Sequence, residues 1–126
     1  MQEYSTDYMS IGPAPDKNVL LSATDAIPGY SVVESKGFAM GSAVMFVPYD
    51  RVIYAFVRSL WHSTARDDLY SEFFRRLRHK ALLRLSENAR RMGANAVLGV
   101  TLQIWRAGYG IYEAYAYGTA VEVKKE

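Results

Sequence analysis

The fold is decided by residues 64–100, which read TARDDLYSEFFRRLRHKALLRLSENARRMGANAVLGV. Apolar side chains recur here at steps of three and four residues, the spacing that places them on one face of a helix. They are Leu69, Tyr70, Phe73, Phe74, Leu77, Ala81, Leu85, Ala89 and Met92. The pattern predicts one long amphipathic helix. Burial of its large side chains, worth roughly 1.5–3 kcal/mol each, would make it the main source of the hydrophobic core.

Boundary signals stand at both ends of this helix. Thr64 can serve as the N-cap, and Asp67 lies in the first turn, where the helix dipole favours negative charge. Arg91 falls in the last turn, and Gly93 follows at the position that favours a left-handed backbone. Residues 95–105 then alternate between two faces, as is typical of a strand.

The rest of the chain favours further strands. They are residues 19–24, residues 31–40 with an extension over 42–47, and residues 111–123. Gly37 and Gly41 lie inside the second of these, where glycine marks a bulge, a bend or a close approach of two backbones. A turn over residues 106–110 separates the last two strands.

The last strand has two unlike faces. One face carries Tyr112, Ala114, Ala116, Gly118 and Ala120. Its small side chains suit the close approach of a helix, most simply the long one. The other face carries Tyr115 and Tyr117 and is too apolar and aromatic for open water, which indicates an interface.

A shorter first helix is predicted over Arg51–Trp61. Residues 52–57 are all apolar and would cover a helix nearly all round, so this helix needs apolar contacts on more than one side. In a domain of this size, another subunit supplies the second side most easily. Phe56, Trp61, Tyr115 and Tyr117 are therefore the expected anchors of an oligomer interface.

Composition limits the class of protein. The 126 residues carry a net charge of +2 and no cysteine, which excludes disulfides, thiolate metal sites and cysteine nucleophiles. The N-terminal residues lack the features of a secretory signal, and no stretch reads as a membrane span, so a cytoplasmic location is expected. We expect an N-terminal arm over residues 1–18 and a single domain over residues 19–126.

Candidate metal ligands are sparse. The weak candidates are His62, His79, Glu34 and Glu113. Neither histidine has a second histidine three or four residues away, the spacing that builds a site on a helix. Soft metals usually require thiolates, which this chain lacks.

Two other function classes receive little support from the sequence. The long helix is rich in arginine, but acidic residues are interspersed, so a solvated face is a simpler interpretation than a nucleic-acid interface. The chain also has no phosphate-binding loop, nucleophile elbow or recognisable catalytic triad. We therefore expect no enzyme, and we regard nucleic acid as an unlikely partner.

An ordered set of short motifs spans residues 20 to 123. These are Ile27-Pro28-Gly29-Tyr30, Glu34, Gly37, Tyr70, Arg78, Ala81, Gly93-Ala94-Asn95-Ala96-Val97, Glu113 and Tyr117-Gly118-Thr119-Ala120-Val121. The set resembles the YbjQ-like family, which carries a heavy-metal-binding label. The resemblance implies an α+β, dodecin-like subunit: a mainly antiparallel sheet with one long and one shorter helix packed on one face. It also implies a ring, most simply a homopentamer, and its label makes a metal ion the one cofactor to consider.

Three polar residues stand at positions that match this family: Glu34, Arg78 and Glu113. A buried carboxylate needs a partner, and arginine can supply a bidentate one. We predict that Glu34 or Glu113 pairs with a basic residue, within or across subunits, in a structural rather than a catalytic role.

The function expected from the sequence is a ring-forming, non-enzymatic homo-oligomer. It would act through assembly itself, or by binding a small ligand or metal at subunit junctions. The alternative is a heavy-metal-binding or metal-responsive module.

Overall fold

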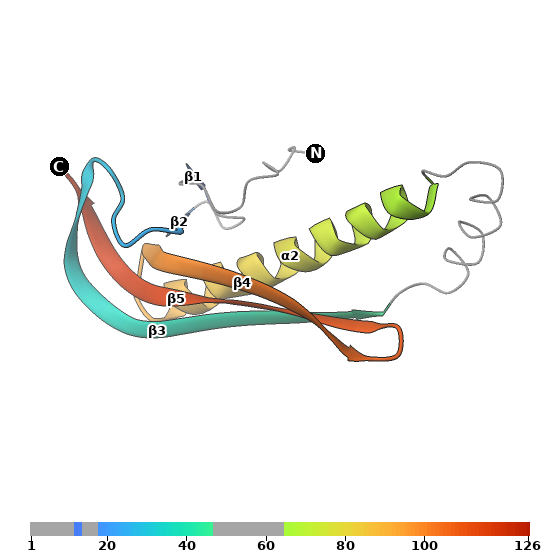
Figure 1. The fold of residues 1–126 in the computed structure, drawn as a ribbon. Coiled ribbons are helices and arrows are strands. Elements are labelled where there is room, and N and C mark those ends of the chain that lie inside the picture. Colours follow the sequence, from blue (N-terminus) through green and yellow to red (C-terminus); the bar gives the residue numbers. More distant parts are fainter. Residues whose placement is uncertain (1–11, 14–17, 47–64) are drawn as a thin grey trace.

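One long helix lies across one face of a twisted five-stranded sheet in the computed structural model, which describes residues 12–13, 18–46 and 65–126 (Figure 1). The helix is α2, Ala65–Arg91. The strands are β1 (Gly12–Pro13), β2 (Leu20–Leu21), β3 (Tyr30–Phe46), β4 (Ala96–Gly108) and β5 (Ile111–Lys125). Their order in the sheet is β1-β2-β4-β5-β3, so the three long strands lie side by side and β3 is at one edge.

The sheet is mixed. β2 runs parallel to β4, whereas the β1–β2, β4–β5 and β3–β5 pairs are antiparallel. The parallel pair arises because the chain leaves β2, passes through β3 and α2, and returns beside β2, the kind of long crossover that parallel neighbours require. Gly12 and Pro13, from the arm expected over residues 1–18, form the short strand β1.

The expected fold class is wrong in its helix count. The described residues contain one helix, not a long and a shorter helix packed on a mainly antiparallel sheet, and β2 makes the sheet mixed. The shorter helix expected over Arg51–Trp61 lies outside the described residues. Nothing in the described part of the chain supports the ring-forming, dodecin-like class that accompanied this expectation.

The predicted C-terminal end of the long helix is confirmed. The helix is described over Ala65–Arg91, and the predicted cap, Thr64, lies outside the described residues. Gly93 has a φ of 87° and donates its N–H to the Arg90 carbonyl, while Ala94 donates to the Ala89 carbonyl. These two bonds form a Schellman motif, which satisfies carbonyls that a helix end would otherwise leave without partners.

The core lies between α2 and the sheet. The helix residues Phe73, Leu77, Ala81, Leu85 and Ala89 are buried there, as the periodicity predicts. The sheet meets them with Ala39, Ala43, Ala114, Ala116 and Ala120. Leu82 and Ser86 are also buried, so the buried side of the helix is wider than the predicted stripe.

Gly41 shows how closely the helix approaches the sheet. A Cβ atom at Gly41 would lie 2.2 Å from the Leu85 nitrogen and 2.6 Å from the Ala81 carbonyl oxygen. Only a residue without a side chain fits at this crossing point. The prediction of a close backbone approach is therefore confirmed at Gly41, and Gly37, with a φ of 108°, sits at a bulge in β3.

A second, smaller cluster lies beside one end of the sheet. It contains Ile27, Ala96, Leu98, Val121 and Val123, with Leu20 and Tyr30 packed against it. The turn at residues 27–30 contributes Ile27 and Tyr30 to it, and the short strand predicted over 19–24 is reduced to Leu20–Leu21.

Candidate functional site

The side of β3, β4 and β5 that faces away from α2 carries large apolar side chains. Strand residues alternate between the two faces, and residues that are opposite in a ladder project to the same face. Met40 lies opposite Tyr117, and Trp105 opposite Glu113, so these side chains share the face that the alanines do not use. We call this set of residues the open face. Its members are Phe38, Met40, Val44, Phe46, Trp105, Glu113, Tyr115 and Tyr117.

The open face is unusually exposed for its composition. Phe38 is 63% exposed, Phe46 is 70% exposed and Trp105 is 56% exposed. Tyr115 and Tyr117 are half-buried between them. Large exposed apolar side chains gathered on one face of a sheet typically mark an interaction site.

The aromatic rings of the open face hold one another in place. Phe38 and Tyr117 have ring centroids 5.8 Å apart, and Trp105 meets Tyr115 edge to face at 5.3 Å. The Trp105 indole N–H donates a hydrogen bond of 2.8 Å to a Glu113 carboxylate oxygen. A hydrogen bond to the same carboxylate raises the pKa of the Tyr115 hydroxyl. The one carboxylate of this face is therefore already hydrogen-bonded to two aromatic side chains.

The predicted interface anchors divide into two pairs. Tyr115 and Tyr117 lie together on the open face, whereas Phe56 and Trp61 lie outside the described residues. The interface role of all four stays a prediction. Phe38 and Trp105 were not among the predicted anchors, although the alternation of Phe38 with glycine and alanine on β3 carries the same signal as the alternation on β5.

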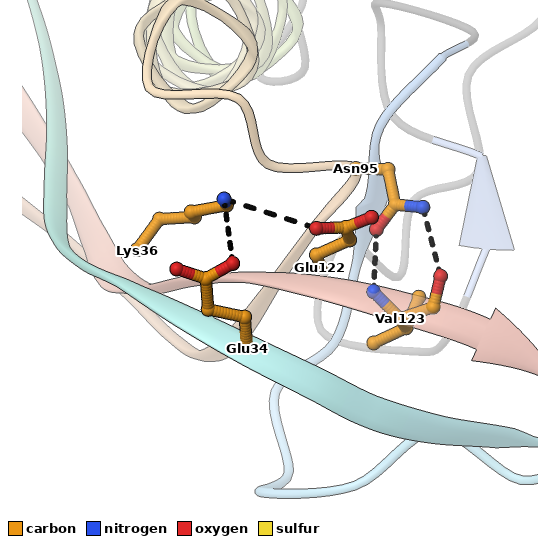
Figure 2. Close-up of polar contacts among 5 residues, drawn as sticks. All are labelled: Glu34, Lys36, Asn95, Glu122 and Val123. Atoms are coloured by element: carbon orange, nitrogen blue, oxygen red, sulfur yellow. Dashed lines mark hydrogen bonds and ion pairs between the residues drawn. The ribbon is translucent and has the colours of Figure 1, made fainter.

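Glu34 belongs to a small ionic cluster at the other end of β3 (Figure 2). The Lys36 ammonium lies 3.0 Å from Glu34 Oε2 and 3.8 Å from Glu122 Oε2. The hydrogen bond to Glu34 raises the pKa of Lys36. Sequence reasoning did not identify Lys36, because its partner on β5 becomes a neighbour only when Glu34 and Glu122 pair in the sheet.

Arg78 is half-buried on α2 and takes part in none of the ion pairs among the described residues. Glu113 accepts from Trp105 rather than from a basic side chain. The structure therefore does not bring Glu34, Arg78 and Glu113 together within one chain.

Asn95 connects three strands of the sheet. The sequence analysis did not predict this role and placed Asn95 only at the start of a strand. Its side-chain Nδ2 donates to the Val123 carbonyl at 2.9 Å, and its Oδ1 accepts from the Val123 N–H at 2.7 Å (Figure 2). Its backbone also accepts from Leu20 and donates to Val121. The Asn95 side chain thus extends the ladder between β4 and β5 by one step, and the backbone ties in β2.

The metal-ligand candidates do not converge in the described residues. Glu113 lies opposite Val44, ten positions along β3 from Glu34, which corresponds to a separation on the order of 30 Å in a strand. His79 is half-buried on α2, and burial lowers its pKa; His62 lies outside the described residues. No group of three or more His, Cys, Asp or Glu side chains that could hold an ion occurs within residues 12–13, 18–46 and 65–126.

Glu34 and Glu122 form the acidic pair that comes closest to a metal site, and a lysine of the same chain neutralises their charge. The Lys36 ammonium already lies between the carboxylates of Glu34 and Glu122, in the position that a cation would take. Two carboxylates with hard oxygen ligands also suit soft metals poorly. The described residues therefore do not fit a heavy-metal site.

Membrane insertion finds no support in the helix. No helix within the described residues is both long and apolar enough to cross a membrane. α2 exceeds the length that a span needs, but charged residues recur throughout it.

Comparisons with known proteins agree with the sequence motifs. Residues 19–124 match the YbjQ family, whose description reads "Putative heavy-metal-binding". A UPF0145 protein of Pyrococcus furiosus is 37% identical over 108 residues, which cover 86% of this chain and 93% of the relative. A UPF0145 protein of Halalkalibacterium halodurans is 38% identical over 108 residues, covering 86% of this chain and all of the relative. The similarity therefore extends across nearly the whole of each relative.

A solved structure shows the same fold at low sequence identity. It is the crystal structure of a protein of unknown function of the DUF74 family from Pediococcus pentosaceus, 12% identical, with a TM-score of 0.51 over 84% of this chain and 98% of the other. At this identity the likeness concerns the fold alone. Because the family match covers residues 19–124 and relatives above 30% identity span most of the chain, this protein belongs to the YbjQ family of UPF0145 proteins.

Proposed function

We propose that the protein is a non-enzymatic homo-oligomer whose subunits associate through the open face of the sheet. The observation that carries the proposal is the exposure of large aromatic side chains on that face, with Phe38, Phe46 and Trp105 each more than half exposed. Burying such side chains is favourable by roughly 1.5–3 kcal/mol each. Interface cores are enriched in the same residue types.

A second copy of this chain is the partner that suits this surface best. Most soluble oligomers are symmetric homo-oligomers, in which one patch meets the same patch or another patch of an identical subunit. The open face carries one charged residue, Glu113, and its carboxylate is already hydrogen-bonded to Trp105 and Tyr115. A surface with a single charged residue opposes few like charges when it meets a second copy of itself.

The aromatic rings of the open face are already packed against one another, which also favours association. Phe38 and Trp105 are held against Tyr117 and Tyr115, so little side-chain freedom is lost when a partner covers them. A small ligand could then lie at a junction between subunits, where the hydroxyls of Tyr115 and Tyr117 supply polar contacts beside apolar walls. The proposal keeps the cytoplasmic location expected from the sequence.

Sedimentation velocity on the untagged chain tests this proposal. The wild type should sediment as a multiple of the 14.2 kDa chain mass, and a Phe38→Ser/Trp105→Ser variant should dissociate toward a single chain. A Val33→Ser variant is the matched control, because Val33 is 60% exposed but lies at the β3 bulge, outside the open face. Circular dichroism would confirm that each variant is folded.

Two results would contradict the proposal. A wild type that sediments as a single chain at micromolar concentration would show that the protein does not self-associate. A double variant that sediments with the same mass as the wild type would show that the subunits associate through a surface other than the open face. Native mass spectrometry on protein prepared without chelator addresses the metal-binding alternative. A metal in fixed ratio to the chain would favour the alternative over assembly alone.

A further inference from the structure

A polar groove lies between α2 and the free edge of β3, and Met40 is the one open-face residue that lines it. It has a volume of about 460 Å³ and opens broadly to solvent. β3 contributes Met40, Gly41 and Ser42, and α2 contributes Arg84, Glu87, Asn88 and Arg91. β3 is the outermost strand on this side, so its backbone forms one wall of the groove without a strand partner in the described sheet.

Two helix side chains bond the edge of β3. Arg84 Nη1 donates to the Ser42 carbonyl at 2.6 Å, and Asn88 Nδ2 donates to the Met40 carbonyl at 2.7 Å. These carbonyls therefore point away from β5. In an antiparallel ladder, the N–H and C=O of one residue point to the same side, so the N–H groups of Met40 and Ser42 also face the free edge.

The free edge of β3 therefore presents mainly hydrogen-bond donors to the groove. The two edge carbonyls are occupied by the helix side chains, whereas the neighbouring edge N–H groups are not taken up by β5. Arg84 uses one of its five N–H donors to bond the Ser42 carbonyl, and its other donors remain for the groove. An unpaired strand edge that offers N–H groups together with a guanidinium is suited to an anion.

Arg91 adds a second positive charge to the same groove. It lies seven residues after Arg84, which is about 10.5 Å along the helix axis and nearly the same angular position. Within the described residues Arg91 makes no ion pair, although Glu87 stands four residues before it. The groove thus has two arginines, an amide and backbone N–H groups against one carboxylate.

From this arrangement we infer that the groove between α2 and the β3 edge binds a phosphate group. A phosphate presents several acceptor oxygens in different directions, which matches donors that come from the helix on one side and the strand edge on the other. Glu87 lies between the two arginines along the helix, so its carboxylate offsets part of their attraction for the anion. Free inorganic phosphate and a small phosphate monoester offer the same chemistry.

Equilibrium dialysis of the full chain with labelled inorganic phosphate tests this inference, at constant ionic strength in a chloride buffer. We expect saturable binding of one phosphate per chain. Arg91→Gln should weaken it at least tenfold, and because Arg91 bonds no described residue, this variant leaves the fold undisturbed. Arg84→Gln should weaken it as well. Arg75→Gln is the matched control, since Arg75 lies on the same helix, paired with Glu72 and away from the groove, and its affinity should equal that of the wild type.

Glu87→Gln gives a result of opposite sign. Removing the negative charge that Glu87 contributes to the groove should tighten phosphate binding by about threefold, the scale of one screened charge at a solvated surface. Adenosine monophosphate, used as a competitor, separates the two sources. Displacement at much lower concentration than unlabelled phosphate identifies an ester as the preferred ligand, and equal displacement identifies free phosphate.

Binding that does not saturate, or that Arg91→Gln leaves unchanged, would overturn the inference. The outcome does not depend on subunit association, because the groove's arginines lie on α2 and neither Phe38 nor Trp105 lines the groove. A Phe38→Ser/Trp105→Ser variant that no longer associates should still bind phosphate as the wild type does.

Discussion

The two faces of the sheet use the same strands in opposite ways. Toward α2, β3 and β5 present alanine and glycine, and the helix fills the space with Leu77, Leu82 and Leu85. Away from α2, alternate residues of the same strands are Phe38, Tyr117 and other large side chains that remain partly or mostly exposed. A small residue in a strand allows another backbone to come close, whereas a large exposed one offers area to a partner.

The two faces have separate roles, folding for the covered face and association for the open face, which a single surface often combines. The covered face determines whether the chain folds, because its side chains are removed from water within a single subunit. The open face adds little to the stability of an isolated subunit, since its largest side chains remain in solvent. Substitutions on the two faces should therefore differ in which measurement they change, and the following predictions test this difference in order of decreasing effect.

The largest effect is expected for truncation on the covered face. Leu85 is fully buried against Gly41 and its neighbours, and Leu85→Ala should lower the free energy of unfolding by about 3 kcal/mol, within the 2–5 kcal/mol known for buried leucines. Phe38→Ala, on the open face, should lower it by less than about 1 kcal/mol when measured at a concentration where the subunits are dissociated. Urea unfolding followed by circular dichroism gives both values.

Equal losses of unfolding free energy in Leu85→Ala and Phe38→Ala would show that the two faces contribute equally to the stability of a subunit. The matching assay is sedimentation, in which Phe38→Ala should reduce the associated mass while Leu85→Ala, once folded at low temperature, should not. Because association stabilises folded subunits by mass action, both unfolding curves need to be measured at several protein concentrations.

The next effect concerns the contact distance between helix and sheet. Gly41→Ala places a methyl group 2.2 Å from the Leu85 nitrogen and 2.7 Å from its Cα, and neither backbone atom can move without shifting the helix. We expect a loss of about 2–3 kcal/mol, near the upper end of the usual cost of overpacking. Gly108→Ala is the control, because its new methyl group would meet only the flexible Ile111 side chain at 3.4 Å. A Gly41→Ala protein as stable as the Gly108→Ala protein would mean that α2 is not held against β3 as tightly as the geometry requires.

Local signals in the sequence were sufficient for most of the fold. The C-terminal end of α2, the long strands and the small-residue face of β5 were predicted because glycine and alternation act over a few residues. The wide buried side of α2 was only partly predicted. Leu82 and Ser86 fall beside the main stripe, and what buries a residue beyond that stripe depends on the tertiary arrangement rather than on helical period.

The candidate sites were harder to predict, since their partners are distant in sequence. The open face was identified on β5 from alternating tyrosines, and its extension to Phe38 and Trp105 required the register of three strands. The groove was not predicted at all. Arg84 meets Ser42 across 42 positions, and Asn88 meets Met40 across 48, so neither pair leaves a periodic trace in the sequence.

The smallest predicted effect concerns His79, which lies on the same side of α2 as buried Leu82 and Ser86. Burial lowers the pKa of His79 below its usual 6.5, so the folded chain binds fewer protons than the unfolded chain just below that pH. Stability that is complete above pH 6.5 should therefore fall as the pH drops toward the lowered pKa, and the change should be smaller than that of Gly41→Ala. The measurement is the free energy of unfolding in urea at pH 7.5 and pH 6.0, where carboxylates such as Glu72, with its own lowered pKa, do not titrate. His79→Gln should flatten the profile in this window, whereas a slope that survives in His79→Gln would show that the covered region of α2 does not extend round the helix to this imidazole.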